Sequence, residues 1–255
     1  MVSAKRVFLL VLLMLSLTTM TGAPSAASEL TDALKARDGA LVRSLLAAGA
    51  DANEEVHGDY PINIAALFGP AELVAVLLDA GAGLEQQGRD GFHPLHNAAA
   101  SGHSEIVALL IQKGAMVDAR ENKGRSALVV FAATAGSNIE IARMLLSAGA
   151  DPELEDSAEH YTALDYAAIN EKVDLGETLI AAHVDINRRD GGYYGDTPLG
   201  IATYYHRKKF VNWLISRGAD VNMTNKLGQT PLQRTRSEML RVLDVEQVLL
   251  DAGAK

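Results

Sequence analysis

A short phrase that returns every 32 to 35 residues constrains the fold of this chain more than any other feature of its sequence. The phrase has two aliphatic residues, two variable residues and then Gly-Ala, and its six full copies span residues 45–50, 77–82, 110–115, 145–150, 214–219 and 249–254. A degenerate copy at 179–184 fills the remaining gap. A second phrase, typified by Thr197-Pro198-Leu199, keeps the same spacing and begins at residues 60, 93, 126, 162, 197 and 230. Two markers in phase predict a tandem array of similar units.

The two phrases mark the ends of a helix pair. A Thr or Ser hydroxyl can cap a helix, and a proline at the next position suits the first turn, where its missing N–H costs nothing. A second helix follows, in which apolar residues recur at positions i, i+3 and i+4, as at Ile106, Leu109 and Leu110. A glycine then ends this second helix in a left-handed conformation. The pattern places Leu109 in the core and Lys113 in solvent.

The chain resembles the ankyrin-repeat family, and the resemblance is clear in residues 90–107, which read DGFHPLHNAAASGHSEIV. It extends over residues 28–255 and implies an all-α fold, an ankyrin-repeat solenoid of stacked helix-turn-helix units joined by β-hairpin-like loops. We therefore expect an N-terminal cap over residues 28–56 and repeats over 57–89, 90–123, 124–158, 159–192, 193–226 and 227–255. Two units are lengthened, around residues 135–138 and 190–196, and insertions in repeat proteins tend to lie on the functional face.

The first 27 residues have the order of a bacterial secretory signal peptide. Lys5 and Arg6 precede an apolar run over residues 7–17, and a stretch of small residues follows at 21–27. We predict cleavage after Ala27 and a periplasmic or secreted product, with no stable membrane span after cleavage. The alternative is an uncleaved signal that anchors the protein in the membrane.

The segment that follows residue 27 is strongly acidic. The whole chain has 23 Lys and Arg against 32 Asp and Glu, and two of the basic residues lie in the predicted signal peptide, so the rest carries a net charge of −11. This charge excludes a nucleic-acid binder, because phosphate contacts need a basic face. We expect a monomer that binds another protein, and the charge makes a basic partner one option.

The chain has no cysteine and none of the common catalytic or nucleotide-binding motifs. We therefore expect no catalytic residue, no cofactor and no metal site. The one candidate metal cluster is His93, His96 and His103, which would have to converge at about 2 Å on one ion. The ankyrin resemblance implies instead that His96 and His103 hydrogen-bond loop and inter-repeat backbone. The acidic run at 151–156 lacks the spacing of a calcium loop and is expected to be a solvated hairpin.

Half of the 12 aromatic residues that follow residue 27 lie within positions 193–213. Phe210 and Trp213 fall on apolar positions of a second helix and belong to the core. The other four are tyrosines, at Tyr193, Tyr194, Tyr204 and Tyr205. The first two lie in the lengthened loop. The last two end a first helix, where the ankyrin resemblance implies positions that face the groove.

We predict that these tyrosines form a partner-binding site with Arg207, because rigid aromatic anchors beside a cation carry much of the energy of an interface. The equivalent pair in an earlier repeat, Leu67 and Phe68, would extend an apolar strip along the same face. The alternative is that the tyrosines pack on one another and only stiffen the loop. If they bind, replacing Tyr194 and Tyr205 with alanine weakens binding by more than about 2 kcal/mol and leaves thermal stability nearly unchanged.

Three functional hypotheses follow from the sequence. The leading one is a non-enzymatic protein–protein interaction module, exported from the cytoplasm, that binds an envelope or extracellular partner through its concave, hairpin-bearing face. The first alternative is an inhibitor or immunity-type protein that neutralises a basic toxin or enzyme, which the negative charge would attract. The second is an enzyme accessory or small-ligand binder, which a deep cavity with convergent polar groups would favour.

Overall fold

The computed structural model describes residues 25–236 and 243–255. Most of the predicted signal peptide, residues 1–24, lies outside these ranges. Helix α2 (Ala26–Lys35) begins within the predicted peptide, where the Ser25 hydroxyl accepts a hydrogen bond from the Ser28 amide at 3.1 Å. Ala27 is fully buried. The predicted boundary after Ala27 therefore falls in the first turn of a packed helix, and processing there would remove its N-cap.

The described residues form fourteen α-helices and one short 3₁₀-helix, η1 (Arg89–Gly91). The α-helices are arranged in seven consecutive pairs. These pairs are α2 with α3 (Gly39–Ala47), α4 (Pro61–Phe68) with α5 (Ala71–Asp79), α6 (Pro94–Ser101) with α7 (Ser104–Gln112), α8 (Ala127–Ala133) with α9 (Ile139–Ser147), α10 (Ala163–Ile169) with α11 (Val173–Ala181), α12 (Pro198–Tyr204) with α13 (Lys208–Ser216), and α14 (Pro231–Arg236) with α15 (Leu243–Asp251). The predicted all-α architecture of stacked helix-turn-helix units is confirmed.

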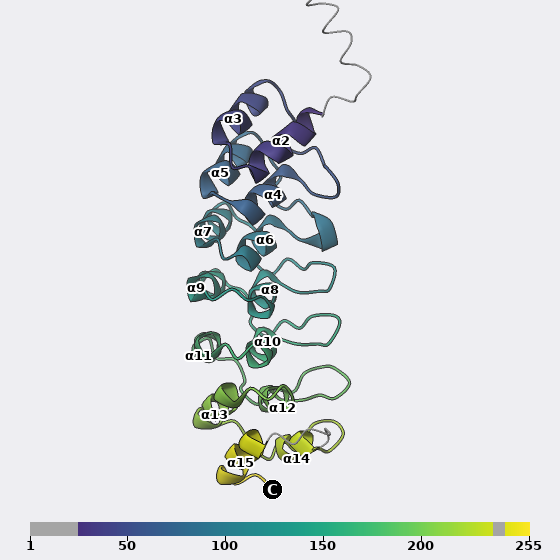
Figure 1. Ribbon diagram of the computed structural model, residues 1–255, viewed down its shortest axis with the longest axis vertical. Helices are drawn as coiled ribbons and strands as arrows, with labels where there is room; N and C mark the ends of the chain where they lie inside the picture. The colour runs from purple at the N-terminus through teal and green to yellow at the C-terminus, as the bar shows by residue number, and fades with distance from the viewer. Residues whose placement is uncertain (1–24, 237–242) are drawn as a thin grey trace, which may run out of the picture.

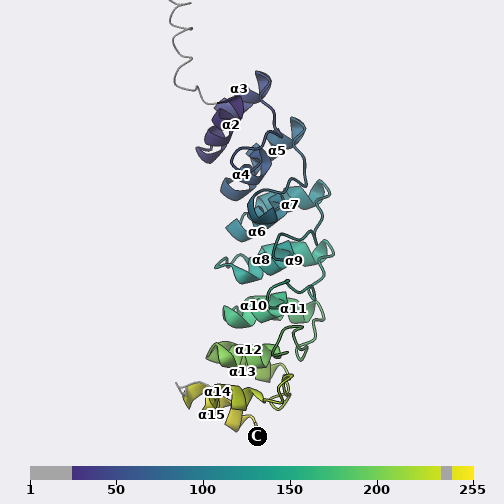
Figure 2. The same ribbon diagram turned by 90° about the vertical axis from the view of Figure 1, so that its right-hand side faces the viewer.

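The pairs stack into a solenoid with three layers (Figure 1). The first helices of the pairs, from α2 to α14, form the middle column, and the second helices, from α3 to α15, form a column beside it. The loops that lead from one pair to the next project from the other side of the middle column. A view turned by 90° shows that the stack is gently curved (Figure 2). Each helix packs on its partner and on the matching helix of the neighbouring pair.

The first helices begin where the Thr-Pro-Leu phrase predicts. The Thr197 hydroxyl accepts a hydrogen bond from the Gly200 amide at 3.2 Å, and the Ser126 hydroxyl accepts one from Val129 in the same way. Proline occupies the first helical position in four of the units, at residues 61, 94, 198 and 231. The phrase therefore acts as a local helix-start signal in each unit that contains it.

The second helices end as the glycine marker predicts. Six glycines take a left-handed φ between 87° and 94°, namely Gly49, Gly81, Gly114, Gly149, Gly218 and Gly253. His183 occupies the same place in the degenerate copy, with a φ of 65°. An L-residue with a Cβ is strained in this region. The geometry at His183 is therefore set by the packing of its repeat and not by its own preference.

One continuous hydrophobic core runs through all seven pairs, from Leu30 to Ala254. In α7 the buried stripe consists of Ile106, Val107 and Leu110, whereas Leu109 is only partly buried. The prediction that Leu109 lies in the core is therefore only partly confirmed: Leu109 packs against the core from its edge, and the fully buried leucine is Leu110. Lys113 is exposed, as predicted.

The loops between pairs are hairpin-like turns, and no extended strand is present in residues 25–236 or 243–255. A typical tip is closed by one backbone hydrogen bond, from the Glu121 amide to the Arg125 carbonyl at 3.1 Å. Neighbouring tips are also tied together, for example by the Asn122 amide, which donates to the Asp90 carbonyl at 2.9 Å. The tips therefore form one linked row along the solenoid. No helix in the described ranges combines the length and hydropathy needed to cross a bilayer.

Candidate functional site

The structure brings three of the four predicted tyrosines together and places the fourth beside them. Tyr193 and Tyr194 lie in the loop before α12, whereas Tyr204 ends that helix and Tyr205 follows it. The rings within each pair pack edge to face, with centroids 5.1 Å apart and an interplanar angle of 87°. Tyr194, Tyr204 and Tyr205 line one hollow of about 150 Å³. The loop and the end of α12 therefore present one aromatic surface.

A cation from the next unit lies against both tyrosine pairs. The guanidinium carbon of Arg234, in α14, is 4.6 Å from the ring centroid of Tyr194 and 4.5 Å from that of Tyr204. Its Nη2 donates to Asp196 Oδ2 at 2.8 Å, and the Arg234 and Asp196 side chains are only 9% and 7% exposed. A desolvated guanidinium against an aromatic face stabilises by about 0.5–2 kcal/mol. Tyr194 and Tyr204 are therefore held in place by a buried ion pair.

The loop that carries Tyr193 and Tyr194 is held by hydrogen bonds from the next loop along the solenoid. The second oxygen of Asp196, Oδ1, accepts a hydrogen bond from Asn225 Nδ2 at 2.9 Å. The Lys226 amide donates to the Tyr194 carbonyl at 2.8 Å, and Lys226 Nζ donates to the Gly191 and Gly192 carbonyls at 2.9 and 2.7 Å. These bonds join two loops that are far apart in sequence, so the aromatic surface has a rigid base.

Three of the four tyrosines are exposed. Tyr193, Tyr194 and Tyr205 are 79%, 46% and 37% exposed, and Tyr204 is half-buried. The rings of Tyr194 and Tyr204 also contact Arg234, so at Tyr194 both sequence interpretations apply to the same residue. The expectation that a Tyr194 and Tyr205 double replacement leaves stability nearly unchanged stays a prediction, and the contact of the Tyr194 ring with the buried Arg234 side chain argues against it.

Arg207 does not supply the cation that stacks on the tyrosines. Its Nε donates to the Ile169 carbonyl at 2.6 Å, which ties α13 to the preceding unit. Sequence reasoning missed Arg234, although a signal was present: Arg234 is the fourth residue of its first helix. The matching positions in the other phrase-bearing units hold uncharged residues, Ile64, Asn97, Val130, Tyr166 and Ile201. A charge at this inward position needs a buried partner.

Leu67 and Phe68 lie at the end of α4, far from the tyrosines. Leu67 is exposed and Phe68 is half-buried, and the Leu67 carbonyl accepts a hydrogen bond from His103 Nε2 at 3.1 Å. Three first helices, α6, α8 and α10, separate α4 from α12. Their matching positions hold mostly small or polar residues, Ala100 and Ser101, Ala133 and Thr134, and Ile169 and Asn170. The predicted continuous apolar strip is therefore interrupted, and Leu67 and Phe68 form a separate patch.

Acidic groups surround the aromatic hollow. Glu159 lines it together with Tyr161, and Glu159 is exposed at the adjacent loop tip. Burial raises the pKa of Tyr161 above its usual range, and the nearby Tyr205, Asp190 and Glu159 add to this rise. Because Asp196 is already paired with Arg234, Glu159 is the carboxylate most open to a partner here. The hollow can therefore receive an apolar or cationic side chain.

The three histidines of the candidate metal cluster form hydrogen bonds with the backbone and with a loop side chain. His96 Nε2 donates to the Arg125 carbonyl at 3.0 Å and its Nδ1 accepts from the His93 amide at 3.3 Å. His93 Nδ1 lies 3.0 Å from Glu85 Oε2. Burial lowers the pKa of His96 to about 4. The predicted backbone roles of His96 and His103 are confirmed, and no group of three or more His, Asp or Glu side chains converges like a metal site in the part of the chain that the structure describes.

The acidic run at 151–156 is not a solvated hairpin. Arg188, in the next loop, pairs with Glu153 at 3.1 Å and with Glu155 at 2.6 Å. Asp156 is buried, and its Oδ1 accepts three backbone amide hydrogen bonds while its Oδ2 accepts one from the Tyr166 hydroxyl at 2.5 Å. The expectation of a solvated hairpin is wrong, because these carboxylates fix the loop and bind it to its neighbour.

Comparison with known proteins matches the whole described solenoid to one family. The family model described as ankyrin repeats (3 copies) matches residues 30–121, 62–156, 116–190 and 164–254. Ankyrin repeat and SOCS box protein 6 of Mus musculus is 38% identical over 92 residues, which are 36% of this chain and 22% of that protein. The protein of the same name from Homo sapiens is 34% identical over 118 residues, 44% of this chain and 28% of its own.

A protein with a different name is also similar to part of this chain. The mitochondrial disaggregase of Bos taurus is 31% identical over 129 residues, 49% of this chain and 18% of that protein. The chain thus spans less than a third of each of these relatives. Each similarity covers only part of the relative, so the activities of the complete proteins do not follow from it.

Proposed function

We propose that this chain, which belongs to the ankyrin-repeat family, is an exported, non-enzymatic module that binds a protein in the cell envelope or outside the cell. Ankyrin repeats imply protein–protein interaction. The export part of the proposal depends on the basic, apolar and small-residue order of residues 1–27. A monomer is the simplest form for such a binder.

The observation that supports the binding proposal is the exposed aromatic cluster on a rigid base. Tyr193, Tyr194 and Tyr205 are exposed, and the rings of Tyr194 and Tyr204 lie against the Arg234 guanidinium. An aromatic side chain that is already fixed loses little conformational entropy on binding, and such anchors are typical hot spots. The interface we propose therefore centres on this aromatic surface, between the loop row and the end of α12.

The charge of the chain favours a basic partner, and with it the inhibitor or immunity-type alternative. Residues 28–255 carry a net charge of −11, and Glu159 lies at the edge of the aromatic hollow. A field of one sign accelerates association with a partner of the opposite sign, and the effect falls with ionic strength. A basic toxin or enzyme would be captured by a surface of this kind.

Affinity capture with a matched pair of variants tests the proposal. The full chain is expressed in its own host, and envelope and extracellular proteins that co-purify are compared for the wild type, a Tyr193→Ala and Tyr205→Ala double variant, and Met116→Ala. Met116 is 54% exposed in a loop of another unit, so its loss removes exposed apolar surface away from the site. We expect one stoichiometric protein that the double variant loses at least tenfold and Met116→Ala retains. Equal recovery with all three would contradict the site.

The export proposal has its own test. Fractionation and N-terminal sequencing of the protein from its host should give a product in the periplasm or medium that begins at Ser28. A product in the cytosol with Met1 intact would contradict export, and a membrane-bound product with residues 1–27 retained would support the anchored alternative. Neither outcome would by itself affect the binding site.

A further inference from the structure

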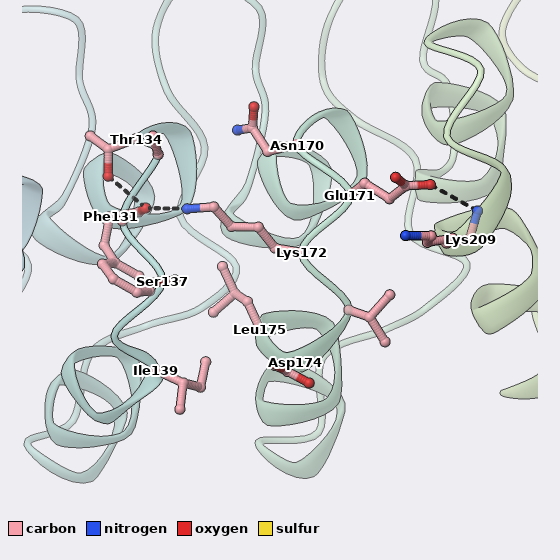
Figure 3. A pocket seen from close by; sticks show the side chains of 13 residues that line it. Phe131, Thr134, Ser137, Ile139, Asn170, Glu171, Lys172, Asp174, Leu175 and Lys209 are labelled. Atoms are coloured by element: carbon pink, nitrogen blue, oxygen red, sulfur yellow. Dashed lines mark hydrogen bonds between the residues drawn. The ribbon is translucent and has the colours of Figure 1, made fainter.

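A cavity of about 600 Å³ opens between the helix turns of the α8–α9 and α10–α11 units, with Lys209 of the next unit at its edge (Figure 3). The segment between α8 and α9 has five residues, 134–138, whereas two residues, 102 and 103, join α6 to α7. Residues 135–137 of this longer segment line the cavity. The insertion that the sequence shows at this place therefore forms part of the cavity wall.

The side chain of Lys172 lies across this cavity, pointing from the start of α11 toward α8 (Figure 3). Its Nζ donates to the Phe131 carbonyl at 3.0 Å and is 5.0 Å from the centroid of the Phe131 ring. An ammonium has three N–H donors. Within the described ranges no carboxylate forms an ion pair with it, and Phe131 supplies its one hydrogen-bond acceptor. Burial lowers the pKa of Lys172 to about 8, because the cavity wall removes part of the water around its ammonium.

The two carboxylates near Lys172 are directed elsewhere. Glu171 Oε1 accepts a hydrogen bond from the Lys209 amide at 2.8 Å, in the first turn of α13. Asp174 is exposed in the first turn of α11, and Figure 3 shows its carboxylate on the other side of Leu175 from the Lys172 ammonium. Helices α9 and α11, each nine residues long, both begin at the cavity, and neither has a side-chain cap. The partial positive charge of these two ends adds to that of Lys172.

One part of the lining is apolar. Ile139, Val173 and Leu175 contribute aliphatic side chains from α9 and α11, and Phe131 adds its ring. Uncharged polar residues Thr134, Ser137 and Asn170 and a second cation, Lys209, complete the wall. A concave site with an apolar wall and a cation that lies across it suits a ligand with an apolar part and an anionic part. The cavity volume exceeds that of a small organic acid.

We propose that this cavity binds a monocarboxylate carried on a short apolar body, with the carboxylate on Lys172 Nζ and the apolar part against Ile139, Val173 and Leu175. This chemistry is found in free aliphatic acids and in the C-terminal residue of a peptide that ends in an aliphatic side chain. The site is independent of the aromatic surface, so it adds a ligand to the function proposed above and does not depend on it.

Calorimetric titration of the full chain with octanoate, octanamide and octylammonium tests the proposal. Octanoate should bind at least tenfold more tightly than octanamide, and octylammonium more weakly than either. Lys172→Met should remove the preference for octanoate, while Lys113→Met, at an exposed position, should retain it. Ser137→Trp, which fills the cavity from the inserted segment and keeps Lys172, should weaken all binding, and it provides the test if Lys172→Met does not fold.

Two peptides distinguish the sources of the carboxylate. A tetrapeptide that ends in leucine is titrated as the free acid and as the amide. Tighter binding of the free acid than of octanoate, lost in Lys172→Met, assigns the site to a polypeptide C-terminus, whereas tighter binding of octanoate assigns it to a free aliphatic acid. Equal affinity for octanoate and octanamide in the wild type, or unchanged octanoate affinity in Lys172→Met, would overturn the proposal.

Discussion

Replacing Arg234 with methionine should strongly destabilise the C-terminal part of the solenoid. The Arg234 and Asp196 side chains are 9% and 7% exposed and 2.8 Å apart. Removing one member of a buried ion pair leaves the other charge without compensation and costs about 3–5 kcal/mol. The methionine keeps the length of the side chain and its contact with the rings of Tyr194 and Tyr204, so the loss reports chiefly the charge.

Urea denaturation of the wild type and the variant measures this cost. If unfolding is cooperative over the chain, a loss of about 3–5 kcal/mol corresponds to a fall in Tm of roughly 6–20 °C for a domain of this size. Adding Asp196→Asn to Arg234→Met should recover much of the loss, because the uncompensated carboxylate is gone while its Oδ1 can still accept from Asn225. Tyr193→Ala, at a largely exposed ring, serves as the control and should change stability by less than about 0.5 kcal/mol.

A small effect would refute the reasoning. If Arg234→Met costs less than about 1 kcal/mol, the ion pair is not desolvated in solution and the aromatic surface has no rigid base. If the double variant is as unstable as Arg234→Met alone, the cost comes from packing and not from the buried, uncompensated charge of Asp196.

Three further predictions concern packing, backbone strain and a buried histidine. Leu110→Ala, at a fully buried position, should lower the free energy of unfolding in urea by about 2–5 kcal/mol through the cavity it leaves, whereas Lys113→Ala should lower it by less than about 0.5 kcal/mol. Equal losses would contradict the helix phase. His183→Gly should stabilise the fold by about 0.5–1 kcal/mol, because glycine adopts the left-handed φ of 65° without strain. Gly149→Ala should destabilise the fold by about 1 kcal/mol from backbone strain alone, since nothing lies within 4 Å of an added Cβ. Burial lowers the pKa of His96 to about 4, so the unfolded chain binds this proton first as the pH falls. The stability difference between the wild type and His96→Gln should therefore shrink by about 3 kcal/mol between pH 7 and pH 4. Burial raises the pKa of Asp165 to about 7 and has the opposite effect on stability, but it is present in both proteins and cancels in the difference; a constant difference would contradict a neutral, buried His96.

The periodic part of the structure could be predicted from the sequence because it is encoded locally. The cap at Thr197 and the left-handed glycine at Gly149 each depend on residues within one turn, so the repeated phrases locate every helix start and end that they mark. The periodicity alone does not decide the register of the buried stripe in α7. Leu109 and Leu110 are both apolar neighbours of Ile106, and only packing against the adjacent helices decides which of them is buried.

The polar contacts between units could not be predicted in the same way. Arg234 reaches Asp196, 38 residues earlier, and Arg188 reaches Glu155, 33 residues earlier. The repeat spacing predicts that neighbouring units lie side by side, but it does not predict which side chains of two facing loops contact each other. For the same reason Arg207 was predicted beside the tyrosines from its nearness in sequence, while the structure gives that place to Arg234.

Site-specific photo-cross-linking tests the central claim, that the aromatic surface binds a protein partner. A photoreactive phenylalanine derivative replaces Tyr205 in one variant and Met116 in another, and both proteins are irradiated in the living host. We predict one cross-linked protein of defined mass at position 205 and none at position 116. Cross-links at 116 alone, or none at 205 in a host that retains the partner, would contradict it.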